Sequence, residues 1–549
     1  MAGGTSSATS TLAKGAAILG AAAIVSKLLG VLQKVPLQNI GGDEAFGIYS
    51  IVFPFYTLIL FLATAGFPVA VSKFVSEAIQ QGQDEETGHI LLSAFVVLTG
   101  TGLLFFAVLF FGAPGIAYLI GNDQTVRSIQ SVSLALFFVP VMAALRGYYQ
   151  GKQNMVPTAA SQVWEQFVRV GTMLALLWWF HQADFGHDWV AAGATFGSAT
   201  GALAGLLVMI YYHRKYVRQR RKQQVEEHVS ASLGHVSSRP RISKYWIRKL
   251  TQYALPICLG AIVVPILNIA DTFTMPRLIA AQGYTAAAAM KEYGIYARGL
   301  PLVQMVAMLF SSMSVALVPA IAASRAKGSV RGVQLQARTA LRLTWLVGLA
   351  SSVGLCLLAT PINGMFYTNT MGSDTIRILA FTIMFSVTNI MTASVLQGMD
   401  AVRIPALHLM IAALMKVALN LLLVPVYGIQ GAAIAAVVSF GTAAALNIRS
   451  LIRMQTITLK WKMDMGIPLI AVAAMALVLQ GWQWLLQLLP LLEMGWPARA
   501  TATLTSLTGV LIGAVVFVIV LITMKGLEPE EIRHIPGLRF RQSRGKVKP

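Results

Sequence analysis

The stretch Phe46-Gly47-Ile48-Tyr49 recurs almost unchanged 247 residues later as Tyr293-Gly294-Ile295-Tyr296. Further matches at the same spacing are Pro54 with Pro301, Gln150-Gly151 with Gln397-Gly398, and Arg169-Val170 with Lys416-Val417. Chance explains one match of this kind, but it does not explain an ordered series of them. The chain is therefore predicted to contain two copies of one folding unit.

The composition shows which solvent surrounds these copies. Hydrophobic residues make up 56% of the 549 positions and charged residues only 11%. A soluble protein carries roughly 25% charged residues, so this chain has too few to cover its own surface in water. Apolar runs of about 20 residues, long enough to cross a hydrocarbon core of about 30 Å, recur along almost the whole chain. We predict an all-α polytopic membrane protein.

About fourteen transmembrane helices are expected, six in each copy and two more at the C-terminal end. Their approximate spans are 15–38, 46–72, 89–112, 126–150, 156–181, 189–213, 247–273, 292–318, 338–360, 374–398, 404–425, 428–452, 465–489 and 502–524. Because six is an even number, both copies have the same orientation in the membrane. This predicts two six-helix lobes in a parallel pseudo-two-fold repeat, with a binding site between them near mid-membrane.

The net charge of +21 does not indicate a nucleic-acid-binding protein, because the Lys and Arg residues concentrate in alternate loops. Residues 214–249 alone hold eleven of them, as the positive-inside rule predicts for a cytoplasmic loop. We expect a cell-membrane protein with both termini in the cytoplasm. The predicted segments are a disordered cytoplasmic leader 1–14, an N-lobe 15–213, a basic cytoplasmic linker 214–246, a C-lobe 247–452, the last two helices within 453–524, and a basic cytoplasmic tail 525–549.

Ionisable residues deep in membrane helices are candidate functional residues, because each costs about 2.5–3.5 kcal/mol at the bilayer centre. Lys27 follows Lys14 by 13 residues, about 20 Å along the helix axis, and is too deep to reach the cytoplasmic surface easily. Lys34 lies two turns further along the same face. Either both cations face an anion, or Lys34 anchors the helix at the outer interface.

The fourth and fifth helices contribute Arg146, Glu165 and Arg169. Glu165 and Arg169 are four residues apart, so they form an internal ion pair or exchange partners with a substrate. Arg146 is either a member of the same site or an anchor at the cytoplasmic interface. We include all three among the predicted substrate-binding residues.

The second copy holds a further group of polar residues. Asn268 and Asp271 share one face of the seventh helix and are predicted gate or ion-coupling residues. An Asp271–Arg298 pair would serve as an outer gate or as a structural clasp. Lys416 and Asn420 lie well inside the eleventh helix and are predicted to line the cavity together with Arg298. Because deep cations outnumber deep anions, the cavity is predicted to be positive.

Catalytic and nucleotide-binding motifs are absent from the sequence. It has no HExxH, no GxxxxGK[ST], no GxSxG, and no paired Cys or His at metal-ligand spacing. We therefore expect a transporter rather than an enzyme, with no cofactor and no metal site. Such a transporter would use the membrane potential or an ion gradient, with Na⁺ or H⁺ as the coupling ion.

Several motifs resemble one family. The segment Ser26-Lys27-Leu28-Leu29-Gly30, the run Arg146-Gly147-Tyr148-Tyr149-Gln150-Gly151 and the stretch Glu165-Gln166-Phe167-Val168-Arg169 are similar to the polysaccharide-biosynthesis branch of the multidrug/oligosaccharidyl-lipid/polysaccharide exporter superfamily. The likeness is greatest to the Gram-positive group that contains stage V sporulation protein B and MurJ-type lipid II flippases. It covers essentially the whole chain.

This resemblance implies a flippase that exports an undecaprenyl-pyrophosphate-linked cell-wall precursor by alternating access. Lys27 then stands where Gram-negative members have a cavity arginine, and Arg298 falls close to another. Gln33 replaces a further cavity arginine, with Lys34 beside it, and no arginine follows Pro54. We expect a monomer that works with the cell-wall synthesis machinery.

Two other classes of protein remain as alternatives. The fold would also suit a multidrug or cation antiporter, but such a site should be acidic. A membrane glycosyltransferase or ligase would need a large outer loop with catalytic carboxylates, and the predicted outer loops are short. Among flippases, the cargo is a peptidoglycan precursor or another lipid-linked repeat, such as a teichoic, capsular or spore-cortex unit.

Overall fold

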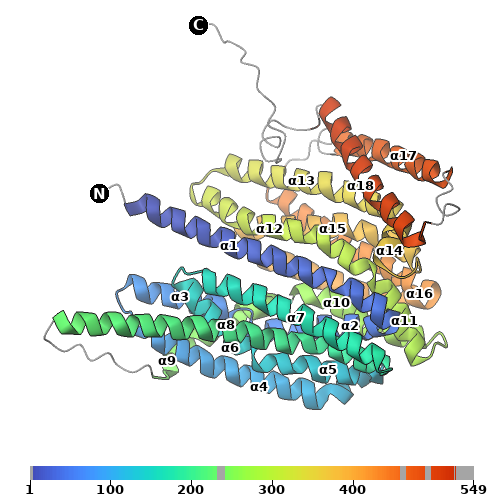
Figure 1. Ribbon diagram of the computed structural model, residues 1–549. Helices are drawn as coiled ribbons and strands as arrows, with labels where there is room; N and C mark the ends of the chain where they lie inside the picture. The colour runs from blue at the N-terminus through green and yellow to red at the C-terminus, as the bar shows by residue number, and fades with distance from the viewer. Residues whose placement is uncertain are drawn as a thin grey trace, which may run out of the picture. The chain divides into compact units, whose positions relative to one another are not determined.

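The computed structural model describes residues 4–230, 241–261, 263–457, 465–488, 496–524 and 526 (Figure 1). These residues are helical almost throughout and include no β-strand. The first helices are α1 (Gly4–Leu32), α2 (Lys34–Thr64), α3 (Phe67–Gln80), α4 (Glu86–Ile120), α5 (Val126–Ser133), α6 (Val139–Gly151), α7 (Val156–Gln182) and α8 (His187–Ser230), with short 3-10 helices at Asp123–Thr125 and Leu134–Phe137. The later helices are α9 (Lys244–Ala261), α10 (Val263–Ala280), α11 (Ala286–Ala297), α12 (Gly299–Ala326), α13 (Val330–Leu357), α14 (Ala359–Phe366), α15 (Ser373–Gly398), α16 (Arg403–Arg453), α17 (Ile467–Leu488) and α18 (Ala498–Thr523).

The predicted all-α polytopic architecture is confirmed. Among the described residues, ten helical stretches are long and apolar enough to cross a membrane. Two of them, Ile18–Gln80 with 63 residues and Arg403–Arg453 with 51, are longer than one crossing requires. Within α16, Gly428 breaks the helix with a φ of 56°, at the first residue of the second of the two spans predicted there. The count of fourteen crossings stays a prediction.

Helices α1 and α8 each extend across one of the predicted segment boundaries. The first helix begins at Gly4, so most of the segment 1–14 is helical rather than disordered. Helix α8 continues to Ser230 and so includes the first half of the predicted linker 214–246, because Arg, Lys and Gln are good helix formers. Residues 231–240, and the tail 525–549 except Gly526, lie outside the described residues. The cytoplasmic location of both ends stays a prediction.

The chain divides into two compact units. The first unit comprises Met1–Met308 and Leu409–Ser439, and the second comprises Leu309–His408 and Phe440–Pro549. The first unit thus takes in α9, α10 and α11 from the predicted C-lobe. The division differs from the predicted lobes because α10 and α11 pack closely on α2. The lobe limits themselves stay a prediction.

The repeated motif explains how α2 and α11 come so close. A Cβ added at Gly47 would lie 2.0 Å from the backbone oxygen of Met290, and one added at Gly294 would lie 1.9 Å from the backbone oxygen of Asp43. Met290 and Asp43 are themselves 247 residues apart, so the contact is reciprocal, as at a two-fold axis. Only glycine at both positions allows the two backbones to touch.

A second pair of repeated glycines makes matching contacts within each unit. In the first unit, Gly151 of α6 packs against Ser72 and Val75 of α3. In the second unit, Gly398 of α15 packs against Val318 and Ile321 of α12. In each case the contact joins the corresponding segments of one copy. The repeat read from the sequence is therefore also present in the packing.

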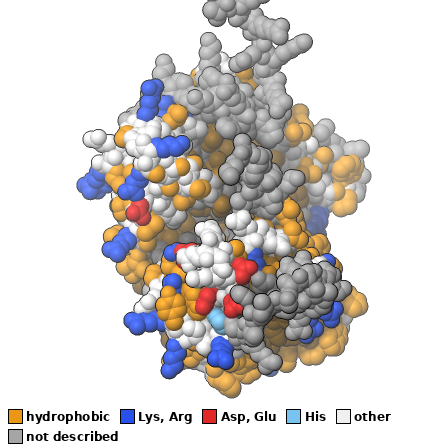
Figure 2. Space-filling model, turned by 90° about the vertical axis from the view of Figure 1, so that its left-hand side faces the viewer, with side chains coloured by type: hydrophobic (Ala, Val, Ile, Leu, Met, Phe, Trp, Pro, Cys, Tyr) orange, Lys and Arg blue, Asp and Glu red, His pale blue; other side chains and the backbone are white. Residues whose placement is uncertain are grey.

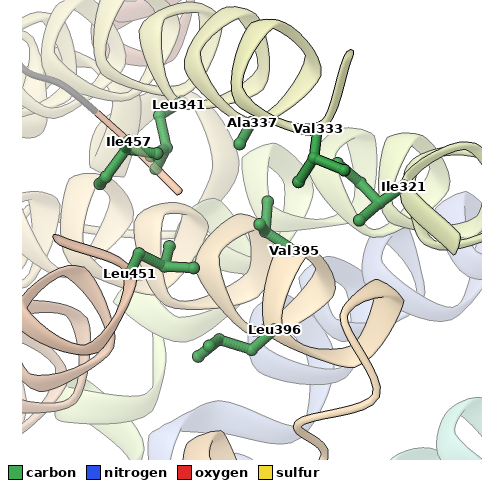
Figure 3. Packing of buried hydrophobic residues seen from close by; sticks show 8 residues of the cluster. All are labelled: Ile321, Val333, Ala337, Leu341, Val395, Leu396, Leu451 and Ile457. Atoms are coloured by element: carbon green, nitrogen blue, oxygen red, sulfur yellow. The ribbon is translucent and has the colours of Figure 1, made fainter. Parts of the chain in front are cut away.

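The second unit has its own apolar core. Eight buried side chains from α12, α13, α15, α16 and the segment after α16 form it (Figure 3): Ile321, Val333, Ala337, Leu341, Val395, Leu396, Leu451 and Ile457. The last two helices belong to this unit, where α17 packs on α13, and α18 packs on α14 and α17. Figure 1 shows α17 and α18 beside one another at the end of the chain.

Large apolar side chains are also exposed, as expected of a protein surrounded by lipid. Phe111 is 74% exposed, Val315 78% and Leu477 71%. Figure 2 shows hydrophobic side chains at the surface of one face, with Lys and Arg among them. A soluble protein rarely exposes contiguous apolar surface of this kind.

We predict that Gly294→Ala and Gly47→Ala each destabilise the protein by about 3 kcal/mol or more, because the added methyl group would overlap a backbone oxygen. Thermal unfolding of the purified protein in lipid nanodiscs measures this. Gly100→Ala is the matched control, since no atom lies within 4 Å of its added Cβ. A glycine variant at position 47 or 294 that is as stable as this control would contradict the packing described.

Candidate functional site

A buried ion pair joins α2 to the end of α11. The Nε and Nη2 atoms of Arg298 lie 2.8 and 2.6 Å from the two carboxylate oxygens of Asp43. The guanidinium is 0% exposed, and Gln38 Nε2 donates a further hydrogen bond of 3.0 Å to Asp43. Such bidentate charge-assisted pairs are the strongest hydrogen bonds that side chains form.

Local backbone geometry positions both partners of this pair. Gly42 breaks α2 with a φ of 77°, immediately before Asp43. Arg298 follows the last residue of α11 and precedes α12, so it also lies at a junction between helices. The nearby contact between Gly47 and Gly294 brings these two junctions together.

A second buried ion pair lies on α10 and α16. Lys416 Nζ is 2.7 Å from Asp271 Oδ2 and 3.1 Å from the backbone oxygen of Leu267. Asn420 Nδ2 donates to Asp271 Oδ1 at 3.0 Å, and the Tyr296 hydroxyl donates to Oδ2 at 3.0 Å. Three donors therefore hold one buried carboxylate.

The predicted Asp271–Arg298 pair is wrong. Arg298 pairs with Asp43, and Asp271 pairs with Lys416. Sequence reasoning missed Asp43 because it lies in a stretch predicted to be an outer loop. In the structure the helical segments on both sides of Gly42 belong to α2, and Asp43 is the first residue after the break. A carboxylate directly after a Gly-Gly pair was the available signal.

The third group of charged residues lies on α6 and α7. Glu165 accepts hydrogen bonds from Arg146 Nη2 at 2.8 Å and from Arg169 Nη2 at 3.3 Å. Arg146 also donates to Ser161 Oγ. The ion pair between Glu165 and Arg169 is thus present, and Arg146 joins it instead of standing alone as an interfacial anchor. One carboxylate is shared by two guanidinium groups, so the cluster carries net positive charge.

A row of glycines on α8 holds this cluster in place. Gly193, Gly197, Gly201 and Gly205 repeat every four residues, the small-residue spacing that lets membrane helices pack closely. A Cβ at Gly201 would lie 2.6 Å from the backbone oxygen of Glu165, and one at Gly197 equally close to that of Arg169. This signal was present in the sequence and indicates where α7 packs.

The remaining predicted site residues do not join these three groups. Lys34 is half-buried and donates to Gln304 Oε1 at 3.4 Å. Lys27 and Asn268 are exposed, and neither side chain has a hydrogen bond or ion pair among the described residues. Next to Lys27, Ser26 Oγ bonds to the backbone oxygen of Gln162 and so ties α1 to α7.

The site residues described above contain more cations than carboxylates. Together with Lys27 and Lys34, the three groups hold six cations and three carboxylates, so this set of residues carries a net charge of +3. These residues are Lys27, Lys34, Arg146, Arg169, Arg298, Lys416, Asp43, Glu165 and Asp271. Within the searched residues no group of three or more His, Cys, Asp or Glu could hold a metal ion.

The helical repeats and the buried charge networks together define a polytopic membrane protein with a transporter fold. The chain belongs to the polysaccharide biosynthesis protein family, whose model matches residues 12–325. The family resemblance noted in the sequence is thereby confirmed.

Two relatives and one solved structure show how far the similarity extends. The chain is 30% identical over 526 residues to the uncharacterized membrane protein YabM of Bacillus subtilis (strain 168), covering 95% of this chain and 94% of that protein. It is 28% identical over 454 residues to lipid II flippase MurJ of the same organism, covering 79% and 81%. A solved structure of lipid II flippase MurJ in an inward closed conformation has the same fold, with a TM-score of 0.66, 16% identity, and coverage of 92% and 98%.

We predict that Glu165→Gln destabilises the protein by about 1–3 kcal/mol, because it removes the only carboxylate that Arg146 and Arg169 are seen to share. Thermal unfolding in nanodiscs is again the measurement. Glu77→Gln serves as the control, since its pair with Lys73 is exposed and its loss should change stability by less than about 0.5 kcal/mol. Equal stability of the two variants would show that the cluster is not structural.

Proposed function

We propose that this protein is a flippase that exports an undecaprenyl-pyrophosphate-linked cell-wall precursor, similar to lipid II, across the cytoplasmic membrane. The observation that carries the proposal is the excess of Lys and Arg over carboxylates among the site residues described above, in a chain that belongs to this family. The relative named lipid II flippase MurJ supports this choice of cargo.

The chemistry of the cargo matches that excess charge. A pyrophosphate carries about two negative charges and cannot cross hydrocarbon without counter-charges. Guanidinium groups bind phosphate oxygens in the same bidentate geometry that Arg298 uses toward Asp43. Lys27, whose ammonium has no partner among the described residues, is available to the same anion.

The ion pair between Asp43 and Arg298 then has a role in the transport cycle. It joins repeated elements, α2 of one copy and the end of α11 of the other. In the proposed cycle a phosphate group replaces Asp43 as the partner of Arg298. Alternating access follows if the packing of α2 on α11 changes when that exchange takes place.

The membrane potential is the proposed driving force. With the cell interior negative, outward movement of an anion is favourable by about 2.3 kcal/mol per charge per 100 mV. The same potential favours return of the empty cationic site toward the cytoplasm. No nucleotide-binding motif occurs in the sequence, so an electrical source of energy suits this chain.

Export of organic cations suits the site less well. A multidrug antiporter needs a carboxylate that is free to accept a cation, whereas Asp43, Glu165 and Asp271 each already contact an Arg or Lys. Teichoic, capsular or spore-cortex repeats share the pyrophosphate chemistry and remain alternative cargoes for the same site.

Substitutions at Lys27 and Arg298 test the proposal. Lys27→Gln and Arg298→Ala should each reduce the appearance of lipid-linked precursor on the outer membrane face by about tenfold or more, in cells depleted of other flippases. Accessibility of the precursor to an external enzyme measures this. Lys327→Gln, at an exposed position after α12, is the control and should flip normally.

Loss of Arg298 also leaves Asp43 buried without its partner, so the double variant Arg298→Ala/Asp43→Asn is needed. If Arg298 binds the cargo, the double variant stays defective although its stability returns toward that of wild type. Full recovery of flipping in the double variant would mean that the pair is structural only. Normal flipping by Lys27→Gln and Arg298→Ala alike would contradict a cationic site.

A further inference from the structure

A row of four aromatic rings joins α3 to α9 in the first unit. The centre of the Phe74 ring on α3 lies 5.6 Å from that of Tyr253 and 5.7 Å from that of Trp246, both on α9. The Tyr245 ring follows, 5.1 Å from Trp246, and Trp246 Nε1 donates a hydrogen bond of 2.7 Å to Glu86 Oε2 on α4. Because α3 comes from the first copy of the repeat and α9 begins the second, the row connects the two copies.

Two lysine ammonium groups lie over this row. Lys73 Nζ is 4.3 Å from the centre of the Tyr253 ring and 5.6 Å from that of Phe74. Lys249 Nζ is 4.8 Å from the centre of the Phe74 ring and 4.9 Å from that of Trp246. Aromatic faces attract cations at these distances. The Phe74 ring therefore holds two like charges, one from each copy, near each other.

These two charges have little anionic compensation within the protein. The half-buried Lys249 has no carboxylate partner among the described residues, and its ammonium donates a hydrogen bond of 3.1 Å to the Tyr245 hydroxyl. Lys73 lies 3.8 Å from Glu77, but the two side chains are 42% and 45% exposed, and exposed pairs contribute little. Glu86 is already bonded to the aromatic row. An external anion is therefore the partner that this pair of lysines lacks.

The predicted depth of the cluster indicates which anion is at hand. Lys73 directly follows the predicted span 46–72, and Lys249 lies in the first turn of the predicted span 247–273, so both belong to the predicted cytoplasmic surface of the membrane. That surface carries anionic lipid head groups. Aromatic and basic side chains at this depth often serve only as helix anchors. Here, however, the central ring, Phe74, is 4% exposed and is packed between the two copies.

We propose that Lys73, Lys249 and Tyr245 bind the phosphate group of an anionic phospholipid. Both ammonium groups donate charge-assisted hydrogen bonds to the phosphate oxygens. The Tyr245 hydroxyl, which accepts from Lys249 and is on a side chain 62% exposed, donates its own proton to the same group. The bound phosphate bridges a lysine of each copy and so strengthens the contact of α3 with α9. None of these residues belongs to the three buried charge networks, so this lipid is a bound partner and not the cargo.

Thermal unfolding in nanodiscs of two compositions tests this proposal. Phosphatidylglycerol added to phosphatidylcholine discs should raise the midpoint of wild type by about 2 °C or more, because the lipid binds the folded state. The double variant Lys73→Gln/Lys249→Gln should lose at least half of this gain. Lys73→Arg/Lys249→Arg should keep it, since both positive charges remain. The matched control Lys327→Gln/Arg331→Gln, which also removes two exposed cations, should behave as wild type.

Native mass spectrometry of the same proteins gives a second readout, in which the Gln double variant should retain one phosphatidylglycerol molecule fewer than the control. An equal gain in midpoint and equal lipid retention in these two variants would overturn the proposal. Inorganic phosphate added to phosphatidylcholine discs separates the two sources of a phosphate group. A lysine-dependent shift of the same size with inorganic phosphate would overturn the assignment to a lipid. Neither readout involves cargo, so these results are independent of the flippase proposal.

Discussion

The contact between Gly47 and Gly294 is the constraint on which the central part of this protein depends. Two helix backbones touch there because neither residue has a side chain, and the contact is reciprocal between the two copies of the repeat. It brings the break after Gly42 next to the end of α11, and so it brings Asp43 within reach of Arg298. In a hydrocarbon environment that proximity matters, because an unpaired charge at this depth would be strongly destabilising.

Much of the architecture could be predicted from the sequence, because the bilayer imposes simple rules. Helix length, the positions of basic loops and a constant repeat spacing can all be read directly from the sequence. They predicted an all-α membrane protein and the segments that repeat. Boundaries were less predictable where charged residues such as those after His213 continue a helix beyond the apolar run. The helix break at Gly428 is consistent with the two spans predicted within α16.

Apart from Asp43, the charged residues of the site were found from the sequence, but most of their partners were not. Pairing four residues apart on one helix is a local property, so Glu165 and Arg169 could be matched. Arg146, Asp43 and Lys416 find their partners 19, 255 and 145 residues away, through packing that no spacing rule describes. The three networks hold four cations and three carboxylates, and Lys27 and Lys34 add two further cations outside them. The positive excess is what an anion-accepting transporter needs.

Transport of a charged and an uncharged lipid by the purified protein tests the central claim most directly. Liposomes containing the protein would be loaded with a polyprenyl-pyrophosphate-linked sugar or with a polyprenyl lipid whose head group is neutral, with and without an imposed membrane potential. The account predicts movement of the pyrophosphate lipid alone, faster when the potential drives the anion across. Equal movement of both lipids, or a rate for the anion that ignores the potential, would contradict it.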